Sequence, residues 1–140
     1  MERELKFRGQ RLDNKEFVYG GYFQHTEEDY VIHYIFTFEN GAIPVDKNTI
    51  GQFIGLKAIN NIEIYETDLI SLGDDIYNED GEPNIIEIVY DEETASFRAY
   101  DYLYYQGSAL AEKWFMDDII LSTTVIGNIY ENPELLTDKV

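Results

Sequence analysis

Two histidines, His25 and His33, are the only imidazole groups with which this chain could do acid–base or metal chemistry. We expect His25 in a turn and His33 in the middle of a strand, among aromatic side chains. A catalytic histidine needs a nucleophile held within hydrogen-bond reach. The sequence contains no Gly-x-Ser-x-Gly elbow, no phosphate loop and no dinucleotide glycine fingerprint. These residues therefore predict a protein that is not an enzyme.

An acidic stretch at residues 73–84 offers oxygen ligands of the kind that hard cations prefer. With Gly81 aligned on the glycine of an EF-hand loop, Asn78 and Asp80 take the third and fifth positions and Glu87 takes the twelfth. Ile76 would then stand first and offers no oxygen. We predict an exposed loop with no metal and no other cofactor. A weak Ca²⁺ or Mg²⁺ site stays an alternative, with the ligands Asp74, Asp75, Glu79, Asp80 and Glu82.

Closely spaced carboxylates elsewhere could serve a hydrolase, which pairs a general acid with a second carboxylate. One group is Asp91, Glu92 and Glu93; the other is Glu112, Asp117 and Asp118. The sequence does not place either group in an aromatic-walled cleft. A carboxylate-dependent hydrolase is therefore the second alternative function.

Aromatic residues are dense between positions 100 and 114, where Arg98 and Lys113 are the nearby cations. In a basic protein such aromatics would suggest a platform for stacking single-stranded nucleic acid. Here the surrounding charge is wrong for it. We expect these side chains to pack a core or to anchor a partner protein, a role in which Tyr and Trp are favoured. The interaction candidates are Tyr100, Tyr102, Tyr104, Tyr105 and Trp114.

The net charge is −18, from 28 acidic and 10 basic residues. Binding to nucleic acid depends on Lys and Arg that displace counterions, so no direct nucleic-acid binding is expected. Carboxylates two residues apart on a strand stand about 6.6–6.8 Å apart, near the spacing of successive phosphates along DNA. The first alternative function is therefore an acidic decoy of a host DNA-binding protein. It requires one continuous acidic face, whereas scattered acids serve solubility.

The chain has no cysteine and no apolar run long enough for a signal peptide or a membrane span. We therefore expect a soluble protein of the bacterial cytoplasm that does not bind membranes. Half of the basic residues lie in the first 15 positions. They could pair with the acidic body of the same molecule or of a neighbour, so a homo-oligomer stays open.

Alternating β-branched and aromatic residues predict an antiparallel meander in the N-terminal part. The expected strands cover residues 16–24 and 29–38, with turns at residues 12–15, 25–28 and 39–41. Asn40-Gly41 supplies the positive φ that a tight turn needs.

Further strands are expected at residues 49–54, 68–72, 85–90, 96–100 and 119–129, with a turn at residues 91–94. Residues 63–66 could form a helical turn or an extended bend. A helix is expected over residues 102–116. Asn132-Pro133 fits a helix cap followed by proline in the first position. The fold class is therefore mainly β, a β-rich α+β domain with one or two short helices. We expect one domain over residues 1–140, with a meander at residues 1–60 and a partly closed, SH3-like barrel at residues 61–140.

A glycine-containing signature occurs twice, as Ile50-Gly51-Gln52 within residues 49–57 and as Val125-Ile126-Gly127-Asn128 within residues 125–136. With residues 62–70, Leu5-Lys6-Phe7-Arg8-Gly9 and Phe17-Val18-Tyr19-Gly20, it resembles the YopX family, small proteins carried by phages and prophages. The resemblance covers nearly the whole chain and implies an accessory protein, but it brings no biochemical activity. The match between the two copies is too short for a tandem repeat. We expect each glycine where another backbone comes close or a strand bends.

On these grounds we expect a non-catalytic protein-interaction module that binds a host or phage protein. The decoy and the hydrolase are the alternatives.

Overall fold

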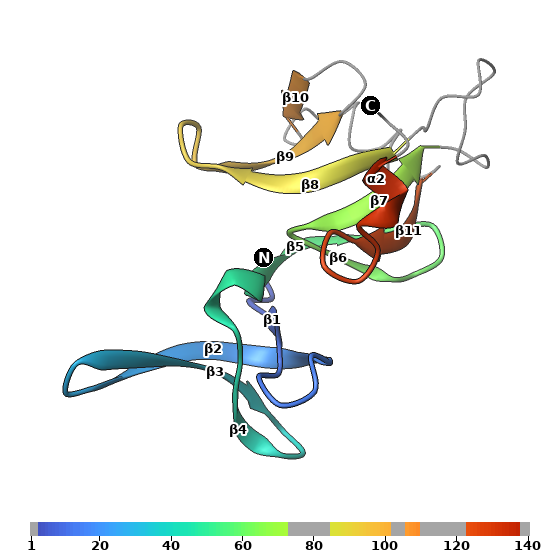
Figure 1. Cartoon of the computed structure of the whole chain (residues 1–140). Helices are drawn as coiled ribbons and strands as arrows, with labels where there is room; N and C mark the ends of the chain where they lie inside the picture. The colour runs from blue at the N-terminus through green and yellow to red at the C-terminus, as the bar shows by residue number, and fades with distance from the viewer. Residues whose placement is uncertain (1–2, 73–84, 102–105, 110–122, 138–140) are drawn as a thin grey trace. The chain divides into compact units, whose positions relative to one another are not determined.

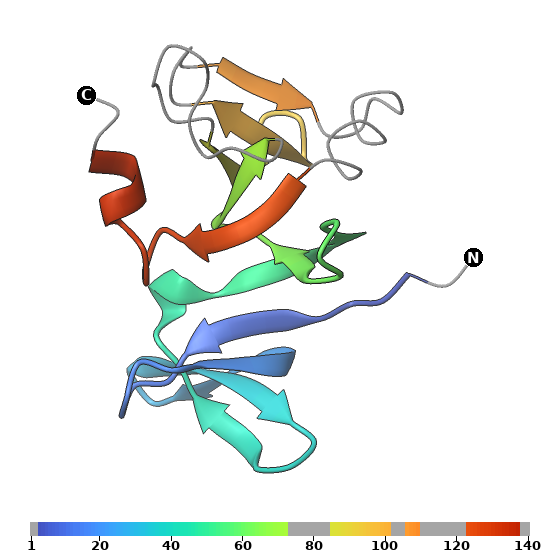
Figure 2. The same cartoon turned by 90° about the vertical axis from the view of Figure 1, so that its right-hand side faces the viewer.

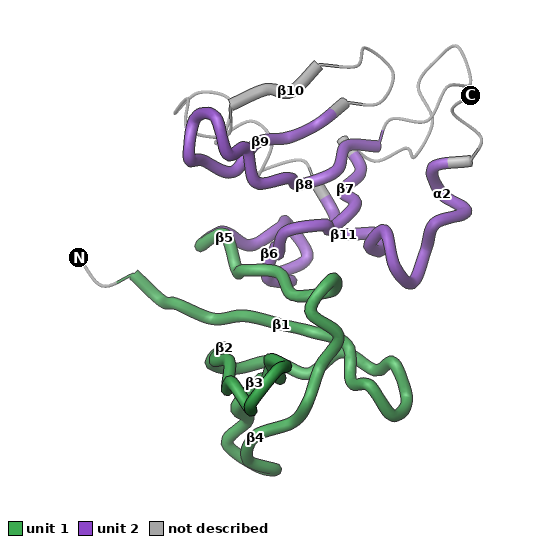
Figure 3. The backbone as a smooth tube through the Cα atoms, turned by 60° about the vertical axis from the view of Figure 1, so that its left-hand side comes forward, with its two compact units in different colours: residues 1–55 green, residues 56–140 purple. Residues whose placement is uncertain are grey.

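The computed structural model of the chain describes residues 3–72, 85–101, 106–109 and 123–137, which form two antiparallel sheets (Figure 1). The chain divides into two compact units, Met1–Gly55 and Leu56–Val140 (Figure 3). The expected β-rich fold is confirmed, and the helices among the described residues are one 3₁₀ turn and one short α-helix.

Unit 1 begins as a meander of the strands β1 (Phe7–Gln10), β2 (Phe17–Glu27), β3 (Tyr30–Thr37) and β4 (Gly41–Pro44). The strand β5 (Gly51–Lys57), which runs on into unit 2, returns to pair with β1 (Figure 2). A bridge joins Arg11 to Val45, and the Leu12 N–H donates to the Pro44 carbonyl at 3.3 Å. These bonds bring the end of β4 against the end of β1, so the meander curls toward a barrel.

One face of this sheet forms the core of unit 1. Ile35 and Ile43 pair directly across β3 and β4, and both are buried. Val45 is also buried and packs over Gly9, where an added Cβ would stand 3.0 Å from Val45 Cγ2. Since side chains alternate between the faces of a strand, the neighbours of these core residues on β2 and β3 point outward.

Two of the three expected turns in this meander are confirmed and one is wrong. The turns at residues 12–15 and 39–41 are present, and Gly41 has the left-handed φ of 71°. The turn expected at residues 25–28 is wrong, because β2 continues to Glu27, which pairs with Tyr30. The polar residues of this stretch line an exposed extension of the hairpin, where solvent-facing strands take polar side chains.

The strand expected at residues 49–54 begins later than predicted. Lys47–Thr49 forms the 3₁₀ turn η1, which Asp46 caps by accepting the Asn48 N–H at 3.0 Å. The hydroxyl of Thr49 accepts the Gln10 N–H at 2.8 Å, which ties η1 to β1. The strand β5 then starts at Gly51.

Unit 2 contains β6 (Glu63–Tyr65), β7 (Asp68–Leu72), β8 (Ile85–Asp91), β9 (Ser96–Asp101), β10 (Gln106–Ala109), β11 (Thr123–Asn128) and the helix α2 (Glu134–Thr137). Residues 63–66, for which a helical turn or an extended bend is expected, contain the strand β6. The β8–β9 hairpin expected around residues 91–94 is confirmed.

The larger sheet of unit 2 has the order β10-β9-β8-β7-β11, with β8 at its centre. Ile85, Ile86 and Ile88 on β8 are buried, as are Leu69 and Ile70 on the neighbouring β7. An apolar run covered on both faces is typical of a central strand. The described strands do not close the sheet into a full barrel, and the partly barrel-like arrangement agrees with the expectation.

The helix expected over residues 102–116 is wrong for residues 106–109, which form β10 and pair with β9. Gly107 and Ser108 are poor helix formers, and pairing with a neighbouring strand satisfies their backbone groups. The other residues of that expected helix lie outside the described residues. The last strand is confirmed at Thr123–Asn128, and residues 119–122 also lie outside.

Candidate functional site

Aromatic side chains gather on the outward face of the β2–β3 hairpin. Phe23 pairs with Tyr34 in the antiparallel register, so every second residue of β2 shares this face with every second residue of β3. We call the surface formed in this way the aromatic face. It consists of Tyr19, Phe23, Tyr30, Tyr34 and Phe36.

The aromatic face is open to solvent, whereas the opposite face of the same strands carries core residues in the part that lies next to β4. Phe23, Phe36 and Tyr30 keep 41%, 54% and 59% of their surface exposed, while Ile35 on β3 keeps none. The rings of Phe23 and Tyr34 stack, with centroids 5.0 Å apart and planes 12° from parallel. Contiguous exposed apolar surface of this kind marks an interaction site more often than scattered single residues do.

A glycine leaves open space within the aromatic face. Gly21 lies between Tyr19 and Phe23 along β2 and pairs with Phe36 across β3. A Cβ added at Gly21 would meet nothing within 4 Å. Its neighbours on this face are Tyr19, Phe23 and Phe36.

Carboxylates cluster at the turned end of the same hairpin. Glu27, Glu28 and Asp29 are all exposed, and we call them the acidic tip. The imidazole of His25, which shares a face with Phe23, lies 2.9 Å from a carboxylate oxygen of Glu27 (Nε2 to Oε1). The aromatic face therefore ends in a strongly acidic edge.

Cations of the same unit already lie over aromatic rings. The guanidinium carbon of Arg8 stands 4.7 Å from the ring centroid of Phe17, and the Lys6 ammonium stands 5.4 Å from that of Phe53. Arg8 is 4% exposed and pairs with Tyr19 across β1 and β2, so it lies beside the aromatic face. Arginine over an aromatic ring is a favourable pair, most of all where water is excluded.

A pocket of about 360 Å³ lies where β4 meets the loop after β1. Its lining is Arg11, Leu12, Asp13, Ala42, Ile43 and Pro44. The Arg11 guanidinium donates to both carboxylate oxygens of Asp13, at 2.8 and 2.7 Å. This hydrogen bonding holds the pKa of Asp13 below, and that of Arg11 above, its ordinary value. The ion pair satisfies the charged groups that the pocket offers.

The two histidines do not meet. His33 Nδ1 lies 2.6 Å from the Tyr22 hydroxyl, on the face of the sheet opposite to the one that carries His25. The two side chains therefore lie on different sides of one hairpin and share no reacting centre.

Most of the residues that the sequence singles out lie outside the described residues. Tyr100 is half-buried on β9, where it pairs with Glu87 of β8. Among the described residues, no three acidic or histidine side chains are grouped so as to hold a metal ion. The candidates that lie outside are Tyr102, Tyr104, Tyr105, Trp114, Asp74, Asp75, Glu79, Asp80, Glu82, Glu112, Asp117 and Asp118.

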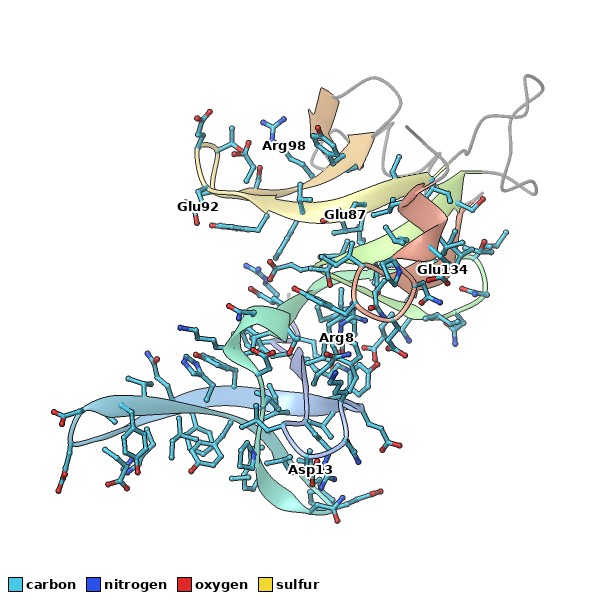
Figure 4. The ribbon with its side chains drawn as sticks, in the orientation of Figure 1. Arg8, Asp13, Glu87, Glu92, Arg98 and Glu134 are labelled. Carbon is cyan, nitrogen blue, oxygen red and sulfur yellow. The ribbon has the colours of Figure 1, made fainter. Side chains whose placement is uncertain are left out.

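The carboxylates at residues 91–93 belong to the turn of the β8–β9 hairpin (Figure 4). Asp91 accepts the Thr94 hydroxyl at 2.8 Å and the Glu93 N–H at 3.0 Å, and it lies 2.8 Å from the Arg98 guanidinium. These partners, the Thr94 hydroxyl foremost, hold the pKa of Asp91 below its ordinary value. Through these contacts Asp91 stabilises the turn between β8 and β9.

The signature at residues 125–136 builds a tight turn after β11. The strand bulges between Val125 and Gly127, and a Cβ at Gly127 would overlap the side chain of Asn132. The buried Asn128 accepts the N–H groups of Tyr130 and Glu131, at 3.0 and 2.9 Å, through one side-chain oxygen. The strand bend expected at Gly127 is present as this bulge, and the group that comes close to the glycine is the Asn132 side chain.

Asn132 stands at the start of the final helical turn, where its backbone carbonyl accepts the Leu135 N–H at 3.1 Å. Its side-chain oxygen accepts the Asn128 N–H at 3.3 Å, back toward β11, and α2 follows at Glu134–Thr137. The expected final helical turn is therefore present. Residues 125–136 therefore form the turn that ends β11 and the short helix that follows it.

The aromatic face was not among the candidates that the sequence suggests. The signal that could have found it lies at residues 30–38, where large apolar residues occupy both faces of the strand. In a strand with a single buried face, only one of these two groups of apolar residues is covered, and the other stays exposed.

These features define a small acidic β-protein whose described surface exposes an aromatic face. The YopX protein family matches residues 6–137, nearly the whole length, and the chain belongs to this family. Protein EF1440 from Enterococcus faecalis has a similar crystal structure, with 22% sequence identity and a TM-score of 0.54 over 96% of this chain and 99% of that one. At this identity the likeness shows a shared fold. No curated protein matches the chain.

None of the helices among the described residues has the length and apolar composition needed to cross a membrane.

Proposed function

We propose that this chain is a non-catalytic protein-interaction module, an accessory protein of a phage or prophage that binds a host or phage protein through the aromatic face. The observation that carries the proposal is the exposure of Phe23, Phe36 and Tyr30 on one side of a hairpin whose other side is core. Large exposed side chains that lie together lose water on binding and supply most of an interface's free energy.

The arrangement of the rings supports the same proposal. Stacking of Phe23 on Tyr34 limits the freedom of both side chains before a partner arrives, which lowers the entropic cost of binding. Gly21 leaves room beside them for a partner's side chain. An exposed surface with ordered rings and open space at Gly21 suits a protein partner better than a small molecule, which needs an enclosing cleft.

Capture from a lysate of the bacterial host tests the proposal. The protein is immobilised in three forms: wild type, Phe23→Ala combined with Phe36→Ala, and Tyr90→Ala as control. Tyr90 is an exposed aromatic on β8 of unit 2, so its variant removes an exposed ring that does not belong to the aromatic face. We expect a partner that the wild type and the control retain and the double variant loses. If all three forms retain the same proteins equally, the aromatic face is not the binding site.

The same experiment separates the alternative functions. An acidic decoy would capture nucleic-acid-binding proteins that elute as salt is raised, with no dependence on Phe23 or Phe36. A hydrolase would act on its substrate without retaining a protein partner. Capture that survives raised salt and requires the aromatic face supports the interaction module.

A further inference from the structure

We propose that the aromatic face binds an extended, arginine-bearing segment of the partner protein, with one guanidinium on the Phe23–Tyr34 pair and a second at the acidic tip. This inference rests on the proposed function, since it names the chemistry of the partner. It is carried by three features of unit 1: the exposed rings, the distribution of charge along the hairpin, and a guanidinium already bound on the same side of the sheet.

The charge distribution selects a cationic partner. Between Lys15 and Lys47 the sequence contains no Lys or Arg. The same stretch, which forms β2, β3 and β4, carries the six acids Glu16, Glu27, Glu28, Asp29, Glu39 and Asp46. The exposed rings therefore lie on a segment that carries negative charge alone, apart from its histidines. Such a surface attracts cationic segments and repels acidic ones.

The molecule itself holds a guanidinium over another ring on the same side of β2. Arg8 lies over the Phe17 ring at 4.7 Å, and Phe17 and Tyr19 occupy the same side of β2 as Phe23. Arg8 comes from the neighbouring strand β1 and is buried in this position. A second arginine, supplied by a partner, would meet equivalent rings further along β2.

The spacing of the two binding places fits an extended chain. Phe23 and Glu27 are four residues apart on one strand, which corresponds to about 13–14 Å. Two arginines four residues apart in an extended peptide span the same distance. The first guanidinium can then stack on the ring pair, while the second forms a bidentate pair with a carboxylate of the tip.

Other occupants fit less well. A second copy of this chain would bring its own acidic tip and a net charge of −18 to the interface, so like charges would face each other. Nucleic acid is repelled for the same reason. Lysine carries the required charge but neither the planar stack nor the fork of donors, so arginine is the better fit.

Isothermal titration calorimetry, with peptides titrated into the protein, tests the inference. The probe is the capped peptide Gly-Arg-Ser-Val-Ser-Arg-Gly, compared with versions in which both arginines are replaced by lysine or by the uncharged citrulline. We expect binding at low salt in the order arginine, lysine, citrulline. The step from arginine to lysine should weaken binding about two- to five-fold for the stacked site, the range of an exposed cation–π pair.

Three protein variants accompany the peptides. Phe23→Ala combined with Phe36→Ala should weaken arginine binding at least about tenfold. Replacement of the acidic tip by Glu27→Gln, Glu28→Gln and Asp29→Asn should weaken it several-fold at low salt and have little effect at high salt. Tyr90→Ala should leave it unchanged. All substituted side chains are exposed, and circular dichroism checks that each variant is folded.

The outcomes separate this inference from the proposed function. Equal affinity for arginine and citrulline peptides, no binding by the wild type, or binding that survives loss of both phenylalanines would each overturn the inference. If a lysate partner is nevertheless lost with Phe23 and Phe36, the interaction module stands and its partner has another chemistry. If no partner depends on these rings, both proposals fail.

Discussion

At the scale of single residues, the described polar side chains of unit 2 mainly stabilise turns and strand ends through hydrogen bonds. Asn128 holds the turn after β11 through two backbone N–H groups, and its side-chain N–H₂ donates to Glu131 at 3.1 Å. Asp68, which pairs with Asn128 across β7 and β11, is buried and accepts the Tyr65 N–H at 2.7 Å. The residues by which the family can be recognised at this end of the chain therefore hold a fold together.

Replacement of Asn128 by alanine should lower the free energy of unfolding by about 1–3 kcal/mol, because the buried side chain is lost and two backbone N–H groups of the turn lose their acceptor. Chemical denaturation of the variant measures this. Asn60→Ala, in an exposed turn, serves as control and should change stability by less than about 0.5 kcal/mol. Equal changes in the free energy of unfolding for the two variants would contradict the role of Asn128 in stabilising the turn.

Two adjacent glycines of β2 offer a matched pair. A Cβ at Gly20 would overlap the carbonyl oxygen of Phe36, whereas a Cβ at Gly21 meets nothing within 4 Å. Gly20→Ala should therefore destabilise the fold by about 1–3 kcal/mol, and Gly21→Ala should be neutral or slightly stabilising, since glycine weakens a strand. Thermal unfolding of both variants tests this, and the reverse order would show that the register of β2 and β3 is wrong.

At the scale of elements, the turns follow from local chemistry more closely than the other features do. Asn40-Gly41 and the turn after Asp91 could be predicted because their residues favour those backbone conformations locally. The extension of β2 through His25 to Glu27 could not, since polar residues suit a turn and a solvent-facing strand equally well. Likewise β10 depends on its pairing with β9, which residues 106–109 do not reveal on their own.

The candidate site depends on which side of β3 is buried, and the alternation of side chains along the strand does not decide this. On β3 both the Ile35 side and the Phe36 side carry large apolar residues, so the sequence could not tell which side is covered. The answer comes from the curl of the meander: Val45, just after β4, is buried and packs over Gly9 of the distant strand β1, on the side that carries Ile35 and Ile43. Sequence reasoning therefore placed the aromatic candidates near Tyr100 and missed the hairpin.

The β8–β9 hairpin should be sensitive to acid through Asp91. Its pKa is lower in the folded protein than in the unfolded chain, where it is about 3.9. The stabilisation is therefore fully present above pH about 4 and is lost as the pH falls through the folded-state pKa. The melting temperature of Asp91→Asn should lie below that of the wild type at pH 7, and the difference should shrink at pH about 3. Glu92→Gln, in the same turn, is the control; a difference that stays constant with pH would contradict this role.

At the scale of the whole molecule, charge is the dominant property. With a net charge of −18 the folded chain repels itself, and salt should relieve this repulsion. The melting temperature should rise between about 0.01 and 0.15 M NaCl, as the screening length falls from about 30 to about 8 Å. Calcium chloride at matched ionic strength should add nothing further if the acidic stretch at residues 73–84 holds no cation. A further rise with calcium would instead support the metal alternative.

The central claim is that the aromatic face of β2 and β3 is where this protein meets its partner. The most direct measurement places a photoreactive benzoylphenylalanine at position 23, or at position 90 as control, and irradiates host cells that produce the protein. We predict that one or a few proteins become cross-linked from position 23 and not from position 90. Cross-links that are the same from both positions, or arise only from position 90, would contradict the account.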